Sequence, residues 1–307
     1  MRITNTMRAH ANLLSIERRG ERYGEAQRQL TTGKRVEAAS DDPAASARVL
    51  KLRSSLARNL QFQRNLDTAR MRLGHAELSL QRVTDQLDEA RAFAVQASTG
   101  TWDGQDRTVL AQEIDQILEG LAGEANRRFL GNSLYAGSQV DQQPFTVLRD
   151  AQGRISQVGA PLDSQDGRVV VKLSETEELQ VSVLGRDVFM GGQEGGEADV
   201  FATLVELRDA LLANDPEATG ESLGRIDATI SAVNGTRAAL GTRMQRIDVV
   251  ESQLFSRQEL LTDNISEEED ADLAEAMMRV NLEQVGYQAA LKAISDSMST
   301  SLLNFLA

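Results

Sequence analysis

The chain carries, at residues 62–97, the segment FQRNLDTARMRLGHAELSLQRVTDQLDEARAFAVQA. Its apolar residues recur at alternating spacings of four and three, which predicts an α-helix with one apolar seam over about five heptads. Such a seam is typical of helices that pack side by side, as in a coiled coil. The seam consists of Phe62, Leu66, Ala69, Leu73, Ala76, Leu80, Val83, Leu87, Ala90, Ala94 and Ala97.

The residues around this segment predict where the helix begins and ends. Asp42 can cap a helix, and Pro43 suits its first position, so the helix is expected to run from Pro43 to near Gly100. At about 1.5 Å per residue it would be roughly 80 Å long. No proline lies between Pro43 and Pro144 or after Pro216, which leaves two tracts free to be helical. A shorter helix is expected next, with Leu110, Ile114, Ile117 and Leu121 on one face.

The second half of the chain repeats the seam. Arg237, Glu251 and Gln258 interrupt it, and Ser266 with Glu269 has the spacing of a capping box that would begin a last helix. The seam residues before this point are Leu223, Ile226, Ile230, Val233, Leu240, Met244, Ile247, Leu254, Leu261 and Ile265. Those after it are Leu273, Met277, Val280, Tyr287, Leu291, Ile294, Met298 and Phe305.

The middle of the chain has a different character. From about Gln139 to Gly196 it is rich in Gly, Asp, Ser and Gln, and residues 168–173 and 178–184 are short β-branched runs that predict strands. The helical pattern resumes near Asp199. The expected fold is mainly α: a long antiparallel, coiled-coil-like helical bundle formed by both halves of the chain, with a small β-rich insertion.

Charge is distributed unevenly between the two ends. Residues 1–60 carry twelve basic and six acidic side chains, whereas residues 261–307 carry two basic and nine acidic ones. Helices of opposite charge can pair along an apolar seam. We therefore expect the N-terminal helix to lie against the C-terminal helix, either within one subunit or between neighbours.

Composition excludes several classes of protein. The 307 residues include no cysteine, so disulfides, thiolate metal sites and a cysteine nucleophile are absent. The net charge of −13 argues against a general nucleic-acid binder, because phosphates are held mainly by Lys and Arg. No apolar run is long enough for a membrane-spanning helix, and residues 1–20 lack the apolar core of a cleaved signal peptide.

Features that could suggest chemistry have simpler interpretations. His10 and His75 stand far apart and outside any metal-binding spacing. Gly33-Lys34 lacks the rest of a phosphate-binding loop, so Gly33 is interpreted as a helix C-cap. The acidic run 267–270 is interpreted as a first helical turn at the positive end of the helix dipole.

Trp102 is either an exposed contact or a cover for the bundle end. The glycines at 191, 192, 195 and 196 suggest a flexible link. No catalytic, cofactor or metal site is predicted.

Short motifs at both ends resemble the bacterial flagellin superfamily. At the N-terminal end these are QLTTGKRV at 29–36, SDDPAA at 40–45, and DR at 106–107 with QEID at 112–115. At the C-terminal end they are ISEEEDADLAEA at 265–276, QAAL at 288–291 and SLLNFL at 301–306. Within the superfamily, MRIT at 1–4, Pro43, NSLYAG at 132–137 and YQAAL at 287–291 are most similar to the branch of distal hook–filament junction proteins.

The resemblance implies a layered structural subunit without enzymatic activity or cofactor. Residues 1–40 with 266–307 would form a terminal helical assembly domain, residues 41–138 with 199–265 a helical bundle, and residues 139–198 a β-rich outer domain. It implies a place in the extracellular flagellum, connecting the hook to the flagellin filament, and export without a cleaved signal peptide.

The resemblance also implies partners. These are the proximal hook–filament junction protein, flagellin, the type III export apparatus and a cytoplasmic export chaperone, with no nucleic acid and no membrane. Copies of the chain would form a ring or helical zone of about eleven subunits, as the helical lattice shared within the superfamily implies.

Apolar seams on a terminal helical pair have few neighbours within one chain and are expected to contact other subunits. The candidate assembly residues are Met7, Leu14, Tyr23, Leu30, Leu273, Met277, Tyr287, Leu291, Ile294, Met298 and Phe305. The simpler alternative is that they pair the two ends of one chain.

Alternative functions for the whole protein are a flagellin filament subunit and, in a different class, a cytosolic coiled-coil scaffold. An enzyme is the least expected.

Overall fold

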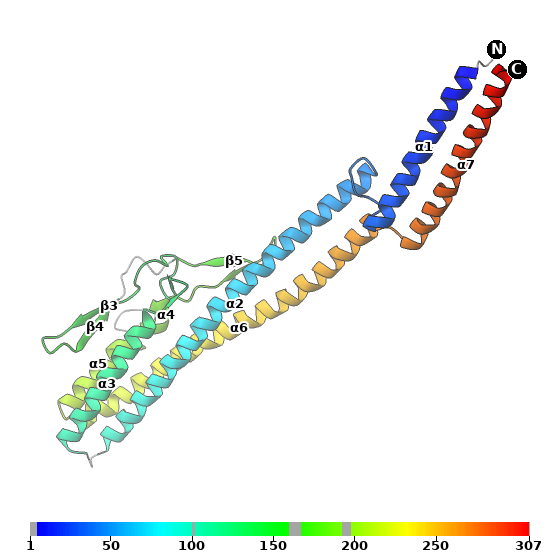
Figure 1. The fold of residues 1–307 in the computed structure, drawn as a ribbon. Coiled ribbons are helices and arrows are strands. Elements are labelled where there is room, and N and C mark those ends of the chain that lie inside the picture. Colours follow the sequence, from blue (N-terminus) through cyan, green and yellow to red (C-terminus); the bar gives the residue numbers. More distant parts are fainter. Residues whose placement is uncertain (1–4, 100–101, 160–166, 192–197, 307) are drawn as a thin grey trace. The chain divides into compact units, whose positions relative to one another are not determined.

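The structure, a computed structural model, describes residues 5–99, 102–159, 167–191 and 198–306. Helices dominate it (Figure 1), in the order α1 Asn5–Thr32, α2 Pro43–Ser98, α3 Gly104–Ala125, α4 Gly185–Phe189, α5 Val200–Leu212, α6 Pro216–Glu269 and α7 Leu273–Leu306. The strands in these residues form three antiparallel pairs: β1 Arg128–Phe129 with β2 Asn132–Ser133, β3 Thr146–Arg149 with β4 Ile155–Gly159, and β5 Val170–Lys172 with β6 Glu178–Gln180. The expected fold class, mainly α with a small β-rich insertion, is confirmed.

The chain divides into two compact units. One, here called the terminal unit, comprises Met1–Asn59 and Ser256–Ala307. The other, the central unit, comprises Leu60–Phe255. Each unit therefore combines sequence from both halves of the chain.

The seam of α2 forms the axis of the central unit. Every seam residue from Leu66 to Ala97 is buried, and Phe62 is partly buried against the same core. The predicted faces of α3 and α6 join it, with Ile114, Leu121 and Ile247 buried. This burial confirms the heptad prediction for these helices. A periodicity of 3.5 residues keeps one face of each helix against its neighbours.

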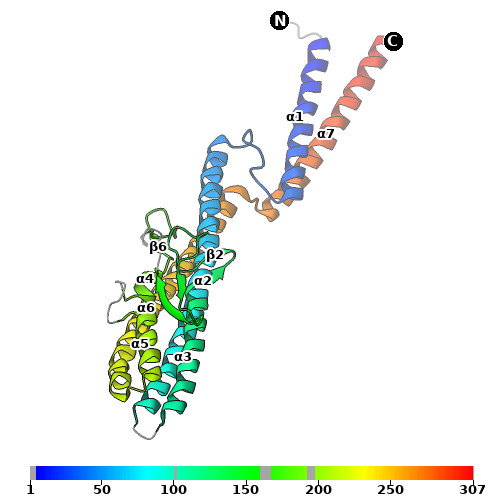
Figure 2. The same cartoon turned by 90° about the vertical axis from the view of Figure 1, so that its left-hand side faces the viewer.

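The charged residues that interrupt the seam of α6 make ion pairs with α2. Arg237 Nη2 donates to Glu77 Oε1 at 2.9 Å, and Arg70 Nη1 donates to Glu251 Oε1 at 2.9 Å. These pairs join residues that become neighbours only when the two helices run antiparallel, an arrangement that both ribbon views show (Figures 1 and 2). The interruptions therefore help to set the register between the helices.

Four aromatic rings hold the segment after α3 to the helices of the central unit. Tyr135, Phe145, Phe189 and Phe201 are fully buried, with ring centroids 5.2–6.0 Å apart. Gly185 lies against them, and a Cβ atom there would be 2.6 Å from Phe145 Cε2. Only glycine fits at this position without moving the ring.

The strands agree with the sequence in part. β5 and β6 lie within the two predicted runs, at 168–173 and 178–184, but are shorter than those runs. The β3–β4 hairpin was not predicted. It is held because Ile155 and Val158 are buried in the core beneath it. Most of its exposed side chains are polar, and the apolar Leu148 is exposed as well. Its alternation is too short to distinguish from a loop by pattern alone.

Helix ends follow the predicted chemistry at several places. Asp42 Oδ1 accepts hydrogen bonds from the backbone N–H groups of Ala44 and Ala45 at 3.0 and 2.9 Å, so α2 begins at Pro43 as expected. Asp199 caps α5 in the same way, through the N–H of Ala202 at 2.9 Å. Gly33 ends α1 with a φ of +69°, the left-handed conformation of a glycine C-cap.

Candidate assembly surface

Helices α1 and α7 form an antiparallel pair within one chain, with both chain ends at the same end of the pair (Figure 1). The rings of Tyr23 and Tyr287 stack with centroids 6.3 Å apart and planes 6° from parallel. Beside them, a Cβ on Gly20 would lie 3.5 Å from Tyr287 Cε2, so the backbone of α1 approaches the ring closely. Among the side chains that the structure describes, no ion pair joins these two helices. Contact between these rings and the α1 backbone therefore helps to hold the pair.

The opposite charges of the two chain ends meet instead where α6 ends. The carboxylate of Glu269 is bonded to Lys34 Nζ and, at 2.6 Å, to Arg53 Nη2. The Glu268 carboxylate accepts two hydrogen bonds from Arg48, at 2.7 and 2.8 Å. We call these five residues the junction cluster. It lies entirely within the terminal unit.

Backbone hydrogen bonds accompany the junction cluster. The N–H groups of Arg35 and Val36 donate to the Glu269 carbonyl at 2.7 and 3.2 Å, and the N–H of Ala271 donates to the Gly33 carbonyl at 2.8 Å. The segment after α1 and the turn between α6 and α7 are thus held together by main chain as well as side chains. Two of the motifs that resemble flagellins, at 29–36 and 265–276, form this single structure.

The predicted capping box at Ser266 and Glu269 is wrong. Both residues belong to the last turn of α6, and α7 begins after Asp272, whose Oδ1 accepts from the N–H of Ala274 at 2.8 Å. The acidic run therefore lies at the negative end of a helix dipole, where carboxylates are disfavoured. Cations from distant parts of the sequence compensate, and sequence spacing alone could not reveal them.

The electrostatics of the cluster follow from these contacts. Hydrogen bonding to Arg48 holds the pKa of Glu268 below its ordinary value. Burial on its own would raise the pKa of Glu269, but its bonds to Lys34 and Arg53 outweigh burial, and the net pKa is lowered. Both carboxylates are therefore ionised at neutral pH.

A second apolar seam runs along α7 on the side away from α1. Met278, Leu282, Val285 and Ala289 are spaced four, three and four residues apart, and all are exposed. Each lies two residues from an inward position such as Ala276 or Tyr287, and two residues of an α-helix turn through about 200°. We call these four residues the outer seam. No described part of the chain covers it.

The predicted assembly residues divide into three groups. Leu14, Leu273, Met277 and Leu291 are exposed. Tyr23, Leu30, Tyr287 and Ile294 are half-buried, and the two tyrosines contact each other. Met7, Met298 and Phe305 lie in α1 and α7, but their side chains fall outside the described part of the structure. The outer seam was not among the predicted seams, although its four residues form a second heptad pattern that lies two residues from the inward positions of α7.

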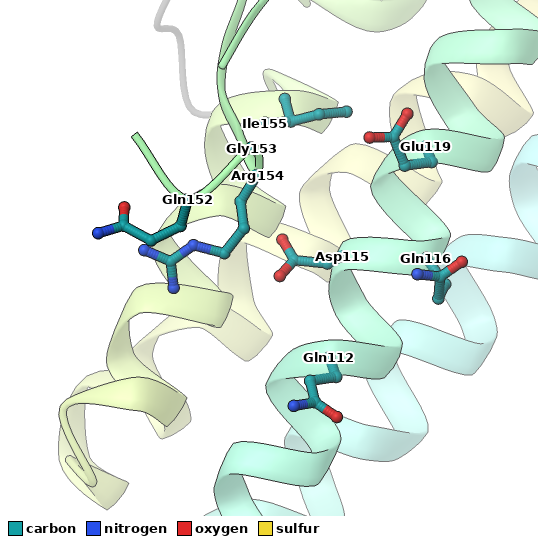
Figure 3. A pocket seen from close by; sticks show the side chains of 8 residues that line it. All are labelled: Gln112, Asp115, Gln116, Glu119, Gln152, Gly153, Arg154 and Ile155. Atoms are coloured by element: carbon teal, nitrogen blue, oxygen red, sulfur yellow. The ribbon is translucent and has the colours of Figure 1, made fainter. Parts of the chain in front are cut away.

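The central unit has a polar cavity of about 310 Å³ between α3 and the β3–β4 hairpin (Figure 3). Its acidic residues are already paired: Asp115 with Arg208 at 3.1 Å and Glu119 with Arg149 at 3.0 Å. The cavity therefore marks where the hairpin is anchored to α3. The described residues contain no group of three His, Cys, Asp or Glu side chains placed to hold a metal ion.

Other predicted features are placed as follows. His10 is exposed on α1, and His75 is exposed on α2 with its ring 4.4 Å from that of Phe129. Trp102 is partly buried against the core of the central unit. Gly191 has a φ of +59°, whereas Gly192, Gly195 and Gly196 lie outside the described residues. None of the helices, over their described residues, combines the length and apolarity that crossing a membrane requires.

Comparisons with known proteins agree with this architecture. The chain is 26% identical to the flagellar hook-associated protein 3 of Escherichia coli K12 over 98% of both chains. It is 24% identical to the flagellar filament 30.7 kDa core protein of Treponema maltophilum, over 88% of this chain and 86% of that protein. Among solved structures, a putative flagellar hook-associated protein from Vibrio parahaemolyticus shares the fold, with a TM-score of 0.66, 19% identity, and coverage of 75% of this chain and 100% of that one.

Two family descriptions match the two helical ends of the chain. Residues 3–140 match the bacterial flagellin N-terminal helical region. Residues 223–306 match the bacterial flagellin C-terminal helical region. Because the two matches together span most of its length, the chain belongs to the bacterial flagellin family.

Proposed function

We propose that this chain is a structural subunit of the bacterial flagellum at the hook–filament junction and has no catalytic role. Support comes from its similarity to a hook-associated protein along nearly the whole of both chains. The structural observation that carries the proposal is the outer seam of α7. A helix with apolar residues on two opposite sides needs a second neighbour besides α1.

The energetics of the outer seam favour association. Met278, Leu282 and Val285 are 66%, 71% and 65% exposed. Full burial of one such side chain contributes roughly 1.5–3 kcal/mol. Repeated on every copy, this contribution is large enough to drive helix packing between subunits once the terminal units meet. Leu273, Met277 and Leu291 extend the exposed apolar surface of α7, and Leu14 is an exposed apolar side chain on α1.

The proposal retains the layered arrangement. Residues 1–40 and 266–307 form the inner assembly domain, residues 41–138 and 199–265 the bundle around it, and residues 139–198 the outer domain. The partners are copies of the same chain, the proximal junction protein on the hook side and flagellin on the filament side. Export proceeds through the type III apparatus with a cytoplasmic chaperone and without a cleaved signal peptide.

A filament subunit is the second candidate, since a filament core protein of Treponema maltophilum is also similar over most of its length. The two functions differ in copy number. A junction protein would be present in few copies per flagellum, because a closed ring or short helical zone contains few subunits, whereas a filament subunit would be its most abundant protein. Quantitative mass spectrometry of purified flagella distinguishes them.

The test of the proposal is complementation of a strain that lacks the gene. The variant Leu282→Asp places a charge in the outer seam, and the control Leu130→Asp places one on a side chain that is 79% exposed in the turn between β1 and β2. We expect Leu130→Asp to restore filaments. Leu282→Asp should be exported but should leave hooks without filaments, because an unpaired charge would be buried between helices. Normal filaments with Leu282→Asp would contradict the proposal.

A further inference from the structure

Two methionines stand next to each other on the exposed surface of α7. Met277 is 56% exposed and Met278 is 66% exposed, and Met278 begins the outer seam. The other methionines with described side chains provide internal comparisons. Met71 on α2 is 50% exposed, Met244 is partly buried, and Met190 is 1% exposed.

We infer that Met278, with Met277 beside it, is an oxidation site through which hydrogen peroxide blocks assembly of the free subunit. The thioether sulfur attacks one peroxide oxygen, the O–O bond breaks, and a sulfoxide and water form. The sulfur is oxidised by two electrons, and the peroxide is reduced by the same two. No other reactant is required.

Exposure determines which methionines react. The sulfur of a buried methionine such as Met190 is shielded by the core, whereas the sulfur atoms of Met277 and Met278 lie on side chains open to solvent. Met71 is open as well, but it belongs to α2 of the central unit, whereas the outer seam belongs to the terminal unit. Met71 should therefore be oxidised as Met277 and Met278 are. Its oxidation should leave assembly unchanged.

The consequence follows from the position of Met278. A sulfoxide is polar and accepts hydrogen bonds, so placing it between packed apolar helices leaves it without a partner. This step rests on the proposed function, since it requires that the outer seam be covered in the assembly. It also predicts that oxidation is limited to the free chain, because packing would shield both side chains.

The chemical part is tested on the purified full-length chain. The chain is treated with hydrogen peroxide, and sulfoxide at each methionine is followed by peptide mass spectrometry. Sulfoxide at Met277 and Met278 should form at least about five times faster than at Met190, as exposure requires. Equal rates at all three positions would overturn the inference, whatever the protein's function.

The assembly part is tested in the strain lacking the gene. Expression of the chain is induced with or without hydrogen peroxide at a dose that does not slow growth, and filaments are counted. The double variant Met277→Leu/Met278→Leu keeps the apolar surface but cannot be oxidised at these positions. Its filament number under peroxide, as a fraction of its own number without peroxide, should be at least about twice the fraction found for the wild type or for Met71→Leu.

A polar substitution tests the same site without oxidant. Met278→Gln should lower the filament number, and Met71→Gln should not. If the sulfoxides form but the leucine variant gives no protection, the inference fails, while the effect of Leu282→Asp still decides the proposed function separately. If Leu282→Asp is without effect, the proposed function fails.

Discussion

At the scale of single residues, Glu269 shows how distant parts of the sequence depend on each other. Its carboxylate is only 7% exposed and is shared between Lys34 and Arg53, whereas Glu267, two residues earlier, is exposed and has no contact among those described. Glu269 therefore connects the segment after α1, the start of α2 and the end of α6. Removing its charge should affect all three within the terminal unit.

The first prediction is that Glu269→Gln destabilises the terminal unit and Glu267→Gln does not. An ion pair with partly exposed cations contributes about 1 kcal/mol, and glutamine keeps the size but not the charge. Hydrogen exchange of residues 33–42 and 266–272 in the full chain should rise roughly fivefold for Glu269→Gln, as that free energy implies. Equal exchange in both variants would show that the pair does not hold the junction.

The second prediction concerns pH. The pKa values of Glu268 and Glu269 are lowered from 4.5 in the folded chain, so near that pH the unfolded chain binds more protons. Their contribution to stability is complete above pH 4.5 and is lost as the pH falls below it. Thermal unfolding followed across this range should show a steeper loss on acidification for the wild type than for Glu268→Gln/Glu269→Gln. Parallel curves would contradict the assignment.

At the scale of elements, the long helices could be predicted from sequence and their connections could not. The seam of α2 was visible because each buried position repeats with a helical period. The end of α6 was misplaced because Ser266 and Glu269 have the spacing of a cap, and only the chain fold shows the cations that hold those acids inside the helix. The β3–β4 hairpin was missed because its burial depends on Ile155 and Val158 meeting distant helices.

The third prediction compares two leucines on α2. Leu80 is fully buried and Leu78 is 57% exposed. Leu80→Ala should lower the free energy of unfolding by about 2–5 kcal/mol, because it removes apolar contact and leaves a cavity. Leu78→Ala should change it by less than about 0.5 kcal/mol. Chemical denaturation of the full chain measures both, and similar losses would show that the seam is placed on the wrong face.

The fourth prediction concerns glycines of opposite character. Gly235 lies inside α6 with open space where a Cβ would be, so Gly235→Ala should stabilise the helix by up to about 1 kcal/mol. Gly33 has a positive φ, so Gly33→Ala should destabilise despite equally open space. Thermal unfolding of the two variants should shift in opposite directions. A shift in the same direction would mean that the backbone at one site is misassigned.

At the scale of the whole molecule, both chain ends contribute to one terminal unit, and that unit carries an apolar seam that the described residues leave uncovered. The central unit is built differently. Its core is continuous, its interruptions are ion-paired, and its β pairs are anchored to the helices. We infer that the terminal unit provides the contacts between copies, while the central unit folds on its own contacts. The candidate assembly residues stay a prediction until such contacts are observed.

Electron microscopy of a strain in which the gene is deleted, combined with an assay of flagellin in the medium, tests the junction role directly. If the chain is a junction subunit, the filament assembles onto it. We therefore expect bare hooks, flagellin released as monomers, and full recovery when the gene is restored. Filaments that remain attached to the hooks of the deletion strain would contradict the junction role.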